Sequence, residues 1–246
     1  MKALPLVSII LAVKNGNSFL RKAVLSILEG VSCSFEVIVV DDGSKDDSIE
    51  SIQDLPVRLI YLAQSGGLAA ARNTGFLHSR GQYVIFMDQD DLLISGSIDK
   101  RVMYLEKNPS VQAVRGKIGN LIDSRGEILE VSPADILCDL PPKRLTIDTL
   151  KYTHSTPGAI WLYLFRRDAI LCNGTHDPDW EEVADCDFLF RFLIKFNVHT
   201  LNLSVTDYRF HGNNATLSGY DKKLISRSNT RAKGALLMLK YGISPF

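Results

Sequence analysis

Hydrophobic and polar positions alternate along the first half of the chain in the manner of repeated strand–helix units. Short apolar runs that suit strands covered on both faces are separated by segments whose apolar residues recur at helical spacing. This order predicts a single Rossmann-like α/β domain with a mixed, mostly parallel central sheet flanked by helices. We expect strands at 7–13, 36–40, 57–63 and 83–87, and helices at 19–28, 45–55 and 68–79.

The pattern loosens after residue 95. Residues 132–155 show no clear period, so a loop that decides specificity would naturally lie there. Residues 221–241 have the pattern of an amphipathic basic helix, and we treat 221–246 as a helical tail that follows a domain of residues 1–220. The other expected elements are a helix at 95–108, a strand at 111–115, a hairpin at 123–126, a strand at 159–165, a helix at 187–196 and a strand at 198–205.

Composition and charge exclude some classes of protein. Of the 246 residues, 46% are hydrophobic and 23% are charged, which is ordinary for a globular protein and excludes a mainly disordered chain. Lys plus Arg equals Asp plus Glu at 28 each, so no overall field attracts nucleic acid, and we expect no nucleic-acid partner. The four cysteines form no zinc-ligand pattern, which favours a reduced, cytoplasmic protein. The sequence begins like a strand and not like a signal peptide, and no run of about 18 apolar residues predicts a membrane span.

An acidic cluster follows the buried strand at 83–87. Asp88, Asp90 and Asp91 come at its carboxyl end, where open α/β sheets bind ligands. Like charges this close repel each other unless a cation neutralises them, and carboxylate oxygens favour Mg²⁺ or Mn²⁺ over zinc. The first hypothesis is a divalent metal that holds a phosphorylated substrate. The alternative is an acidic turn that caps the next helix.

A second pair of carboxylates, Asp41 and Asp42, follows the strand at 36–40. Parallel strands end at one edge of a sheet, so both clusters can meet in one crevice, where one aspartate accepts from a base or ribose while another ligates the metal. That division suits a nucleoside diphosphate, and the alternative is that Asp42 and Ser44 cap a helix. Gly67 is a donor-site candidate because the start of its helix offers N–H groups to phosphate or carboxylate, and plain helix packing is the alternative.

Four segments together resemble the family 2 glycosyltransferases, which are inverting enzymes with the A-type nucleotide-sugar-binding fold. These segments are Val7 to Ile10 with Val13 and Asn15, residues 36–44, Ala71 to Gly75, and residues 81–91. They follow the order of the family. The resemblance implies a nucleotide-sugar donor, with a UDP-sugar favoured, that binds with Mg²⁺ or Mn²⁺ in a donor half (1–110), and an acceptor that binds in the other half (111–220).

The resemblance also implies roles for residues of the donor half. Asp42 would contact the base, Asp88 would face the ribose or diphosphate, and Asp90 would ligate the metal. Asp91 would support this group or cap a helix. The remaining donor-binding residues would be Val13, Asn15 and Arg72.

The acceptor block of the family is matched incompletely at 184–191. The family carries a Glu-Asp pair, then an acidic residue and an arginine. Asp185 keeps the aspartate and is the candidate base, since a carboxylate can take the proton of the attacking hydroxyl. Ala184 stands where the glutamate is expected, so either Glu181 or Glu182 supplies the missing carboxylate by another loop path, or activity is impaired.

The other acceptor-binding candidates in this region are Trp180, Asp187 and Arg191. Trp180 could stack on an acceptor sugar, and a buried core tryptophan is its alternative. The structural alternative for the block is an acidic helix start with Arg191 as a partner on the same helix.

Residues 208–216 resemble a late histidine-containing segment of the family. By this resemblance His211 meets the metal or diphosphate, and a purely structural histidine is the alternative. The chain lacks the Gln-x-x-Arg-Trp segment of processive members. We therefore expect transfer of one sugar to a saccharide or lipid-linked saccharide in polysaccharide, lipopolysaccharide or glycan assembly.

Two other functions remain open. One is a catalytically impaired nucleotide-sugar-binding protein. The other is a sugar-phosphate nucleotidyltransferase, which should show a glycine-rich phosphate loop that 13–17 matches poorly. The tail at 221–241 could lie on an anionic membrane and make the protein peripheral at its inner face, or it could pack on the domain or on the second subunit of a homodimer.

Overall fold

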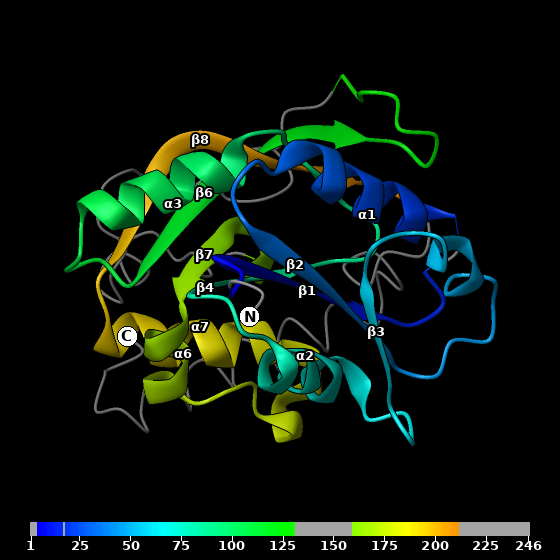
Figure 1. Cartoon of the computed structure of the whole chain (residues 1–246), viewed down its shortest axis with the longest axis horizontal. Coiled ribbons are helices and arrows are strands. Elements are labelled where there is room, and N and C mark those ends of the chain that lie inside the picture. The colour runs from blue at the N-terminus through cyan, green and yellow to red at the C-terminus, as the bar shows by residue number, and fades with distance from the viewer. Residues whose placement is uncertain (1–3, 17, 131–158, 212–246) are drawn as a thin grey trace.

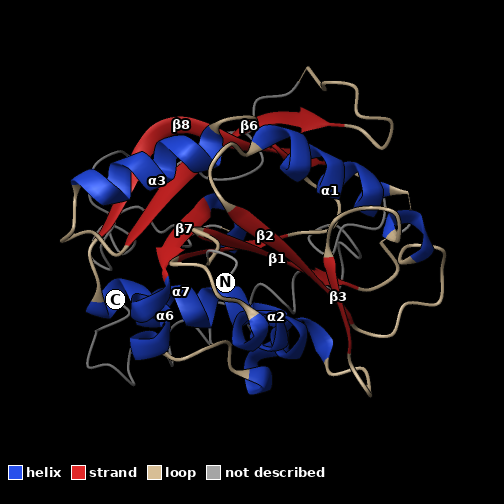
Figure 2. Cartoon of the chain, viewed as in Figure 1, coloured by secondary structure: helices blue, strands red, loops and turns tan. Residues whose placement is uncertain are grey.

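The structure, a computed structural model, describes residues 4–16, 18–130 and 159–211, without the side chains of 181–183. The expected specificity loop and the tail lie outside these residues. Figures 1 and 2 show the described elements. The strands are β1 (Val7–Val13), β2 (Phe35–Asp41), β3 (Arg58–Tyr61), β4 (Tyr83–Met87), β5 (Leu92–Leu93), β6 (Ala113–Ile122), β7 (Tyr163–Arg166) and β8 (Val198–Arg209). The helices are α1 (Phe19–Gly30), α2 (Gly67–His78), α3 (Ser97–Lys107), α6 (Arg167–Asn173) and α7 (Ala184–Lys195), with 3₁₀ helices η1 (Glu50–Ile52), η2 (Ile160–Leu162) and η3 (Pro178–Val183).

The strands form one sheet in which parallel and antiparallel pairs are mixed. Its order is β3-β2-β1-β4-β7-β6-β8-β5. β1 pairs in parallel with β2 and β4, and β2 pairs in parallel with β3. β7 runs antiparallel to both β4 and β6, whereas β6 and β8 are parallel. This confirms the predicted α/β domain with a mixed, mostly parallel sheet.

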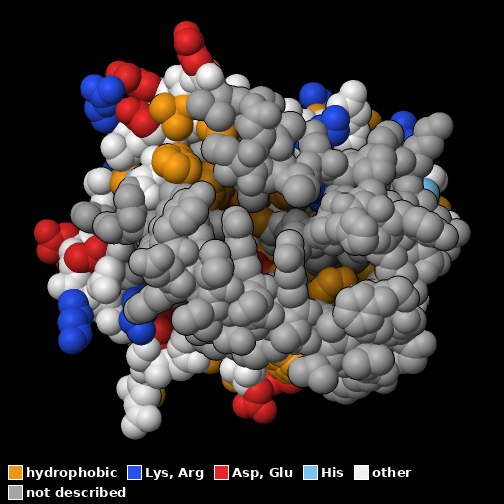
Figure 3. Space-filling view, turned by 180° about the vertical axis from the view of Figure 1, so that it is seen from behind, with side chains coloured by type: hydrophobic (Ala, Val, Ile, Leu, Met, Phe, Trp, Pro, Cys, Tyr) orange, Lys and Arg blue, Asp and Glu red, His pale blue; other side chains and the backbone are white. Residues whose placement is uncertain are grey.

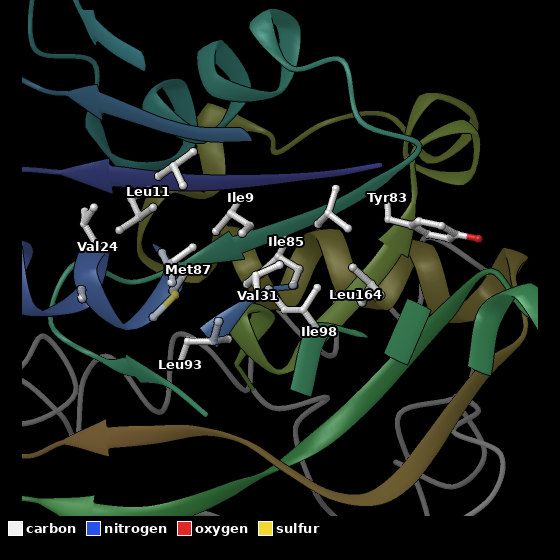
Figure 4. Close-up of a cluster of buried hydrophobic side chains, with 14 of the residues drawn as sticks. Ile9, Leu11, Val24, Val31, Tyr83, Ile85, Met87, Leu93, Ile98 and Leu164 are labelled. Carbon is white, nitrogen blue, oxygen red and sulfur yellow. The ribbon is translucent and has the colours of Figure 1, made fainter. Parts of the chain in front are cut away.

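Helices cover both faces of the sheet, so the described part of the chain has three layers (Figure 1). α1 and α3 lie on one face, and α2, α6 and α7 lie on the other. The first face packs around Ile9, Val24 and Ile98 (Figure 4), and the second packs around Ile10 and Phe86. Adjacent residues of a strand point to opposite faces, so an unbroken apolar run such as β1 is what a sheet buried on both sides requires.

Two predicted elements differ in type from the structure over part of their length. The helix expected at 45–55 is a series of turns with the short helix η1. Asp46 accepts hydrogen bonds from both the N–H and the hydroxyl of Ser48, and this local bonding competes with a regular helix. The strand expected at 159–165 begins only at Tyr163, because η2 precedes it. A short apolar run does not by itself distinguish a strand from a buried helical turn.

The strands β6 and β8 are longer than predicted and bring the chain back to the acidic edge. The sequence predicts ends at 115 and 205, whereas β6 runs to Ile122 and β8 to Arg209. Their pairing shifts register at several places, which bends the pair. The last part of β8 pairs with β5, which follows directly after Asp91. The segment after β8 therefore reaches the acidic cluster.

In the view of Figure 3, both acidic and basic side chains of the described residues are visible along the edge of the molecule. No helix within the described ranges combines the length and the apolar character that crossing a bilayer requires.

Candidate active site

The central strands β1, β2 and β4 place the acidic residues at one edge of the sheet. β1 is parallel to both neighbours, so the three carboxyl ends lie together. β2 ends directly before Asp42, and β4 ends directly before Asp88. The N–H of Asp42 donates to the carbonyl of Val13, the last residue of β1, at 2.8 Å. The Val13 side chain is buried in the core, so Val13 meets this edge through its backbone.

Asp42 is buried, and its carboxylate caps the start of α2. It accepts from the N–H groups of Gly66 at 2.6 Å and Gly67 at 3.2 Å, from the Ser65 hydroxyl at 2.8 Å, and from the Lys14 ammonium at 3.2 Å. Burial opposes the charged form, but the hydrogen bonds from Gly66, Ser65 and Lys14 outweigh it and lower the pKa of Asp42. The helix start that the sequence offers to a phosphate or carboxylate therefore holds the carboxylate of Asp42.

The loop after β1 joins the two acidic clusters. The N–H of Lys14 donates to Gln89 Oε1 at 3.0 Å, and Gln89 Nε2 donates back to the Lys14 carbonyl at 3.2 Å. Asn15 has a φ of +52°, and its N–H donates to the Ser44 hydroxyl at 3.0 Å. The Asn15 side-chain oxygen accepts from the N–H of Lys45 at 2.8 Å. The predicted donor residue Asn15 thus ties the loop after β1 to the loop after β2.

Arg72 joins the end of β4 to the acceptor block. Its buried guanidinium donates from Nη2 to Asp88 at 2.9 Å and from Nη1 to Asp185. Burial raises the pKa of Asp88, Arg72 works against that rise, and repulsion by Asp90 and Asp185 adds to it, so the pKa lies above its usual value. The side chain of Asp88 still keeps 35% of its surface exposed. One fixed cation therefore holds the predicted base beside the carboxylate predicted to face the ribose or diphosphate.

Asp90 and His211, the two predicted metal ligands, lie side by side. His211 Nε2 is 2.9 Å from Asp90 Oδ2, and the His211 ring stacks on Phe19 with centroids 4.8 Å apart. Within residues 4–16, 18–130 and 159–211, no three His, Cys, Asp or Glu side chains form a metal-binding group. The Asp90 carboxylate fits a Mg²⁺ or Mn²⁺ ion, which often takes one or two protein carboxylates and leaves other positions to substrate phosphates and water. The His211 imidazole is a less usual ligand for such ions than an oxygen atom.

Asp91 is fully buried next to this pair. Its Oδ1 accepts from the N–H of Arg209 at 2.9 Å, and its Oδ2 has no partner in the described part of the chain. Burial, followed by repulsion from Asp90 and Asp88, raises the pKa of Asp91 well above its usual value. Arg209 also donates from Nε to the carbonyl of Asp90 at 2.8 Å. Asp91 and Arg209 together anchor the end of β8 to the acidic loop.

Asp187 and Arg191, two predicted acceptor residues, bind each other along α7. Arg191 donates to Asp187 Oδ2 from Nε at 2.9 Å and from Nη2 at 2.7 Å. Arg191 also donates to the carbonyls of Asn173 at 2.9 Å and Thr175 at 2.8 Å, so it fixes the loop that follows α6. The structural alternative, in which Arg191 pairs with an acidic residue of its own helix, therefore holds for Asp187. It does not hold for Asp185, whose carboxylate binds Arg72.

The remaining acceptor-side residues lie around the start of α7. Trp180 is half-buried in the 3₁₀ helix η3. Ala184, where a glutamate was expected, is buried as the first residue of α7. The side chains of Glu181 and Glu182 lie outside the described set, so the structure does not test whether either one replaces that glutamate.

The sequence did not single out His176, which lies beside Asp185. His176 Nε2 is 3.8 Å from Asp185 Oδ1. The loop that carries His176 is bound by Asn73, the neighbour of Arg72 on α2, whose amide hydrogen-bonds the His176 backbone in both directions. No local sequence pattern indicates the contact between Asn73 and His176, because these residues are 103 positions apart. Asn73, within the segment Ala71 to Gly75, is the signal that could have pointed to it. Lys14, Ser65 and Arg209 were also missed.

Part of the chain matches a known family. Residues 8–171 match the family model described as Glycosyl transferase family 2. A glycosyltransferase of Bacillus subtilis (strain 168), EpsJ, is 30% identical over 222 residues, which cover 87% of this chain and 63% of that protein. A glycosyltransferase of Haemophilus influenzae is 36% identical over 110 residues, which cover 43% of this chain and 44% of that protein. A third, from Rickettsia typhi, is 28% identical over 246 residues, which cover 94% of this chain and 76% of that protein. All three are named as uncharacterized glycosyltransferases.

Solved structures share the fold. The crystal structure of S. aureus TarS 1-349 in complex with UDP-GlcNAc has a TM-score of 0.72 at 17% identity and covers 95% of this chain and 65% of that chain. The structure of TarS 1-349 described without a ligand has a TM-score of 0.70 at 16% identity, with the same coverage. At this level of identity the likeness establishes the fold alone. This chain spans less than two thirds of the length of TarS 1-349 and of the Bacillus and Haemophilus relatives.

Proposed function

The chain belongs to glycosyl transferase family 2, and on that basis we propose that it transfers one sugar from a nucleoside-diphosphate sugar to an acceptor hydroxyl. The observation that carries the proposal is the bridge that Arg72 forms between Asp88 and Asp185. Sugar transfer needs the donor and the acceptor hydroxyl at one anomeric carbon. Arg72 joins the carboxylate that follows the donor strand β4 to a carboxylate of the acceptor block, so it would hold the two proposed substrate sites next to each other.

Asp185 is the proposed general base. Its side chain is 27% exposed, so an acceptor hydroxyl can approach it. As the hydroxyl oxygen attacks the anomeric carbon, its proton passes to the Asp185 carboxylate. The bond from that carbon to the leaving nucleoside diphosphate breaks on the opposite face, so the configuration inverts. Arg72 fixes the direction of the carboxylate before the acceptor arrives.

Asp90 and His211 are the proposed ligands of Mg²⁺ or Mn²⁺. When bound, such a cation supplies positive charge that stabilises the leaving diphosphate. The contribution of the chain is to hold the two ligands together. Arg209 binds the Asp90 carbonyl, and Phe19 stacks on the His211 ring.

A UDP-sugar is the proposed donor. TarS, which shares this fold, has structures in complex with UDP-GlcNAc and with UDP. We assign contact with the ribose or diphosphate to Asp88, and contact with the base to Asp42, where the base would displace the exposed Lys14 ammonium from the carboxylate. The other proposed donor-binding residues are Val13, Asn15, Gly67 and Arg72.

The proposed acceptor is a saccharide or a lipid-linked saccharide in polysaccharide, lipopolysaccharide or glycan assembly. Trp180 is the residue that we propose to contact the acceptor directly. Asp187 and Arg191 would act by shaping the loop after α6, to which Arg191 donates. A cytoplasmic protein with peripheral contact at the inner face of the membrane would meet such an acceptor.

A nucleotide-sugar-binding protein that has lost turnover is the second candidate. Its support is Ala184, whose buried methyl group stands where the family carries a glutamate. The two candidates differ in whether the bound donor is consumed.

The test is to incubate the protein with Mn²⁺ and a panel of nucleotide-sugars while the released nucleoside diphosphate is measured. Proton NMR then identifies the anomer of the released or transferred sugar. We expect UDP from one UDP-sugar, with the anomeric configuration inverted. Binding of a nucleotide-sugar without release would contradict turnover and support the binding protein. Formation of pyrophosphate from a nucleoside triphosphate and a sugar 1-phosphate would instead indicate a nucleotidyltransferase.

A further inference from the structure

His176 is a buried histidine whose ring is held on several sides. The residue is 2% exposed, and its ring stacks on Phe188 with centroids 4.7 Å apart and 13° between the planes. Phe86 meets it edge-on at 5.0 Å. The N–H of His176 donates to Asn73 Oδ1 at 2.9 Å, and Asn73 Nδ2 donates to the His176 carbonyl at 2.7 Å. The ring therefore has little freedom to turn.

The polar edge of this ring faces Asp185. Nε2 is 3.8 Å from Asp185 Oδ1, and neither ring nitrogen has a hydrogen-bond partner among the described residues. An unsatisfied buried polar atom costs free energy, and an apolar aromatic ring would fill the same stack without that cost. The separation is longer than a hydrogen bond, as catalytic contacts often are before substrate binds. These observations favour a role for the nitrogen atoms beyond packing.

We propose that His176 is a positioning residue for Asp185. The neutral imidazole directs an Nε2–H toward the carboxylate and, together with Arg72, holds that carboxylate oriented for the acceptor hydroxyl. The tautomer follows from the partner, because an ionised carboxylate oxygen only accepts hydrogen bonds. The inference rests on the proposed function, in which Asp185 is the base, and it adds a residue from a loop outside the acceptor block.

The charges around the ring explain why a histidine can serve here. Burial, with added repulsion from the guanidinium groups of Arg72 and Arg191, lowers the pKa of His176 well below its usual value. Three acidic groups accompany them: Asp185 faces the ring and binds Arg72, Asp88 also binds Arg72, and Asp187 binds Arg191. A neutral donor orients the carboxylate without a full positive charge. A second cation would oppose the proton transfer that a base must accept.

Three variants separate positioning from packing. His176→Phe keeps the aromatic stack and removes the polar edge, and His176→Gln retains a side-chain N–H group. The matched control is His78→Phe, at an exposed position on α2. We expect His176→Phe to fold and to lose about ten- to a hundredfold in kcat, with the KM for the donor unchanged within about twofold. His176→Gln should recover part of kcat, and His78→Phe should match the native protein.

The pH–rate profile gives a readout that a packing role would not move. Loss of the Nε2–H removes a hydrogen-bond donor that orients the proposed base, so the pH–rate profile of His176→Phe should differ from the native profile, whereas that of His78→Phe should not. A folded His176→Phe protein with native kcat and a native profile would overturn the proposal.

Nitrogen NMR of the labelled imidazole tests the pairing without turnover. At neutral pH we expect a neutral ring with the proton on Nε2, and an Nε2 signal that shifts in Asp185→Asn. A proton on Nδ1 instead, or an Nε2 signal indifferent to Asp185→Asn, would overturn the proposal. If no nucleotide-sugar were consumed while the signal still responded, the proposed function would fail and the pairing of His176 with Asp185 would stand.

Discussion

The carboxylates of Asp42 and Asp185 both contact residues of α2. They differ in the number of hydrogen bonds that they accept. Asp42 is buried and accepts from two backbone amides, a hydroxyl and an ammonium group. Asp185 is partly exposed, accepts from Arg72 and faces His176. A carboxylate surrounded by donors is fixed in its ionised form, whereas one with an open side can still take a proton. The comparison assigns Asp42 a structural role at the start of α2, and it supports the proposal that Asp185 is the base.

One helix serves both carboxylates. α2 receives Asp42 at its first residue, Gly67, and presents Arg72 to Asp185 about one and a half turns later. It lies close against β1, because a Cβ atom on Gly75 would come within 2.3 Å of Ile10 Cγ2. The position of this helix therefore sets the geometry of both centres, and substitutions at each centre can separate their roles.

The largest effect is expected at the reactive carboxylate. Asp185→Asn removes the proposed base and should lower kcat by about 10²- to 10⁴-fold. Because Asp185 belongs to the proposed acceptor side, donor affinity measured by calorimetry should stay within about twofold of native. The matched control is Asp168→Asn, an exposed carboxylate on α6. Activity of Asp185→Asn equal to that of the control would assign the base to another residue.

Arg72→Met tests the bridge between the two halves. It leaves Asp88 and Asp185 without their shared cation, and we expect the free energy of unfolding in urea to fall by about 2–4 kcal/mol. This is somewhat less than for a fully buried pair, since both carboxylates keep some exposure. Arg72→Lys keeps the positive charge but loses the planar guanidinium group that binds both carboxylates. Its free energy of unfolding should lie between that of Arg72→Met and that of the native protein. Native stability in both variants would show that the bridge contributes nothing to folding.

Asp42→Ala tests the saturated carboxylate. The amides of Gly66 and Gly67 lose their acceptor, so we expect unfolding to become easier by about 2 kcal/mol. Asp42→Asn should lose less, because the amide oxygen still accepts. Stability at the native level in Asp42→Ala would mean that water replaces the carboxylate without cost.

The smallest expected effect is the pH dependence of the contribution that the Asp42 carboxylate makes to the free energy of unfolding. The folded-state pKa of Asp42 is lowered, so its contribution is complete above the unfolded-state value of about 3.9 and is lost as the pH falls through the folded-state pKa. The difference in unfolding free energy between the native protein and Asp42→Asn should be constant above about pH 5 and shrink below about pH 4. A difference that grew toward low pH would reverse the assigned direction of the shift.

The donor half could be predicted from sequence because its signals are local. The strands β1, β2 and β4 are unbroken apolar runs, and the carboxylates follow β2 and β4 within a few residues. The failed helix at 45–55 shows the limit of such patterns, since the bonds between Ser48 and Asp46 act over two positions and do not change the apolar spacing.

The acceptor half depends on contacts between distant segments. Arg72 and Asp185 are 113 residues apart, and His211 and Asp90 are 121 apart. The resemblance to a family named four of these residues as members of one site. It did not indicate which of them would touch. It was also silent on His176, whose place follows from the packing of the loop after α6 on α2.

The measurement that tests the donor site most directly is a thermal-shift experiment with UDP, with and without Mn²⁺, on the native protein and on Asp90→Asn. Ligand that binds the folded state at about 100 times its Kd adds about 2.7 kcal/mol to stability, which is a shift of several degrees. We predict a UDP shift that requires Mn²⁺ and disappears in Asp90→Asn, while Asp168→Asn keeps it. A UDP shift of equal size without Mn²⁺ and in Asp90→Asn would contradict the metal site, and no shift with UDP or any other nucleoside diphosphate would contradict the donor site.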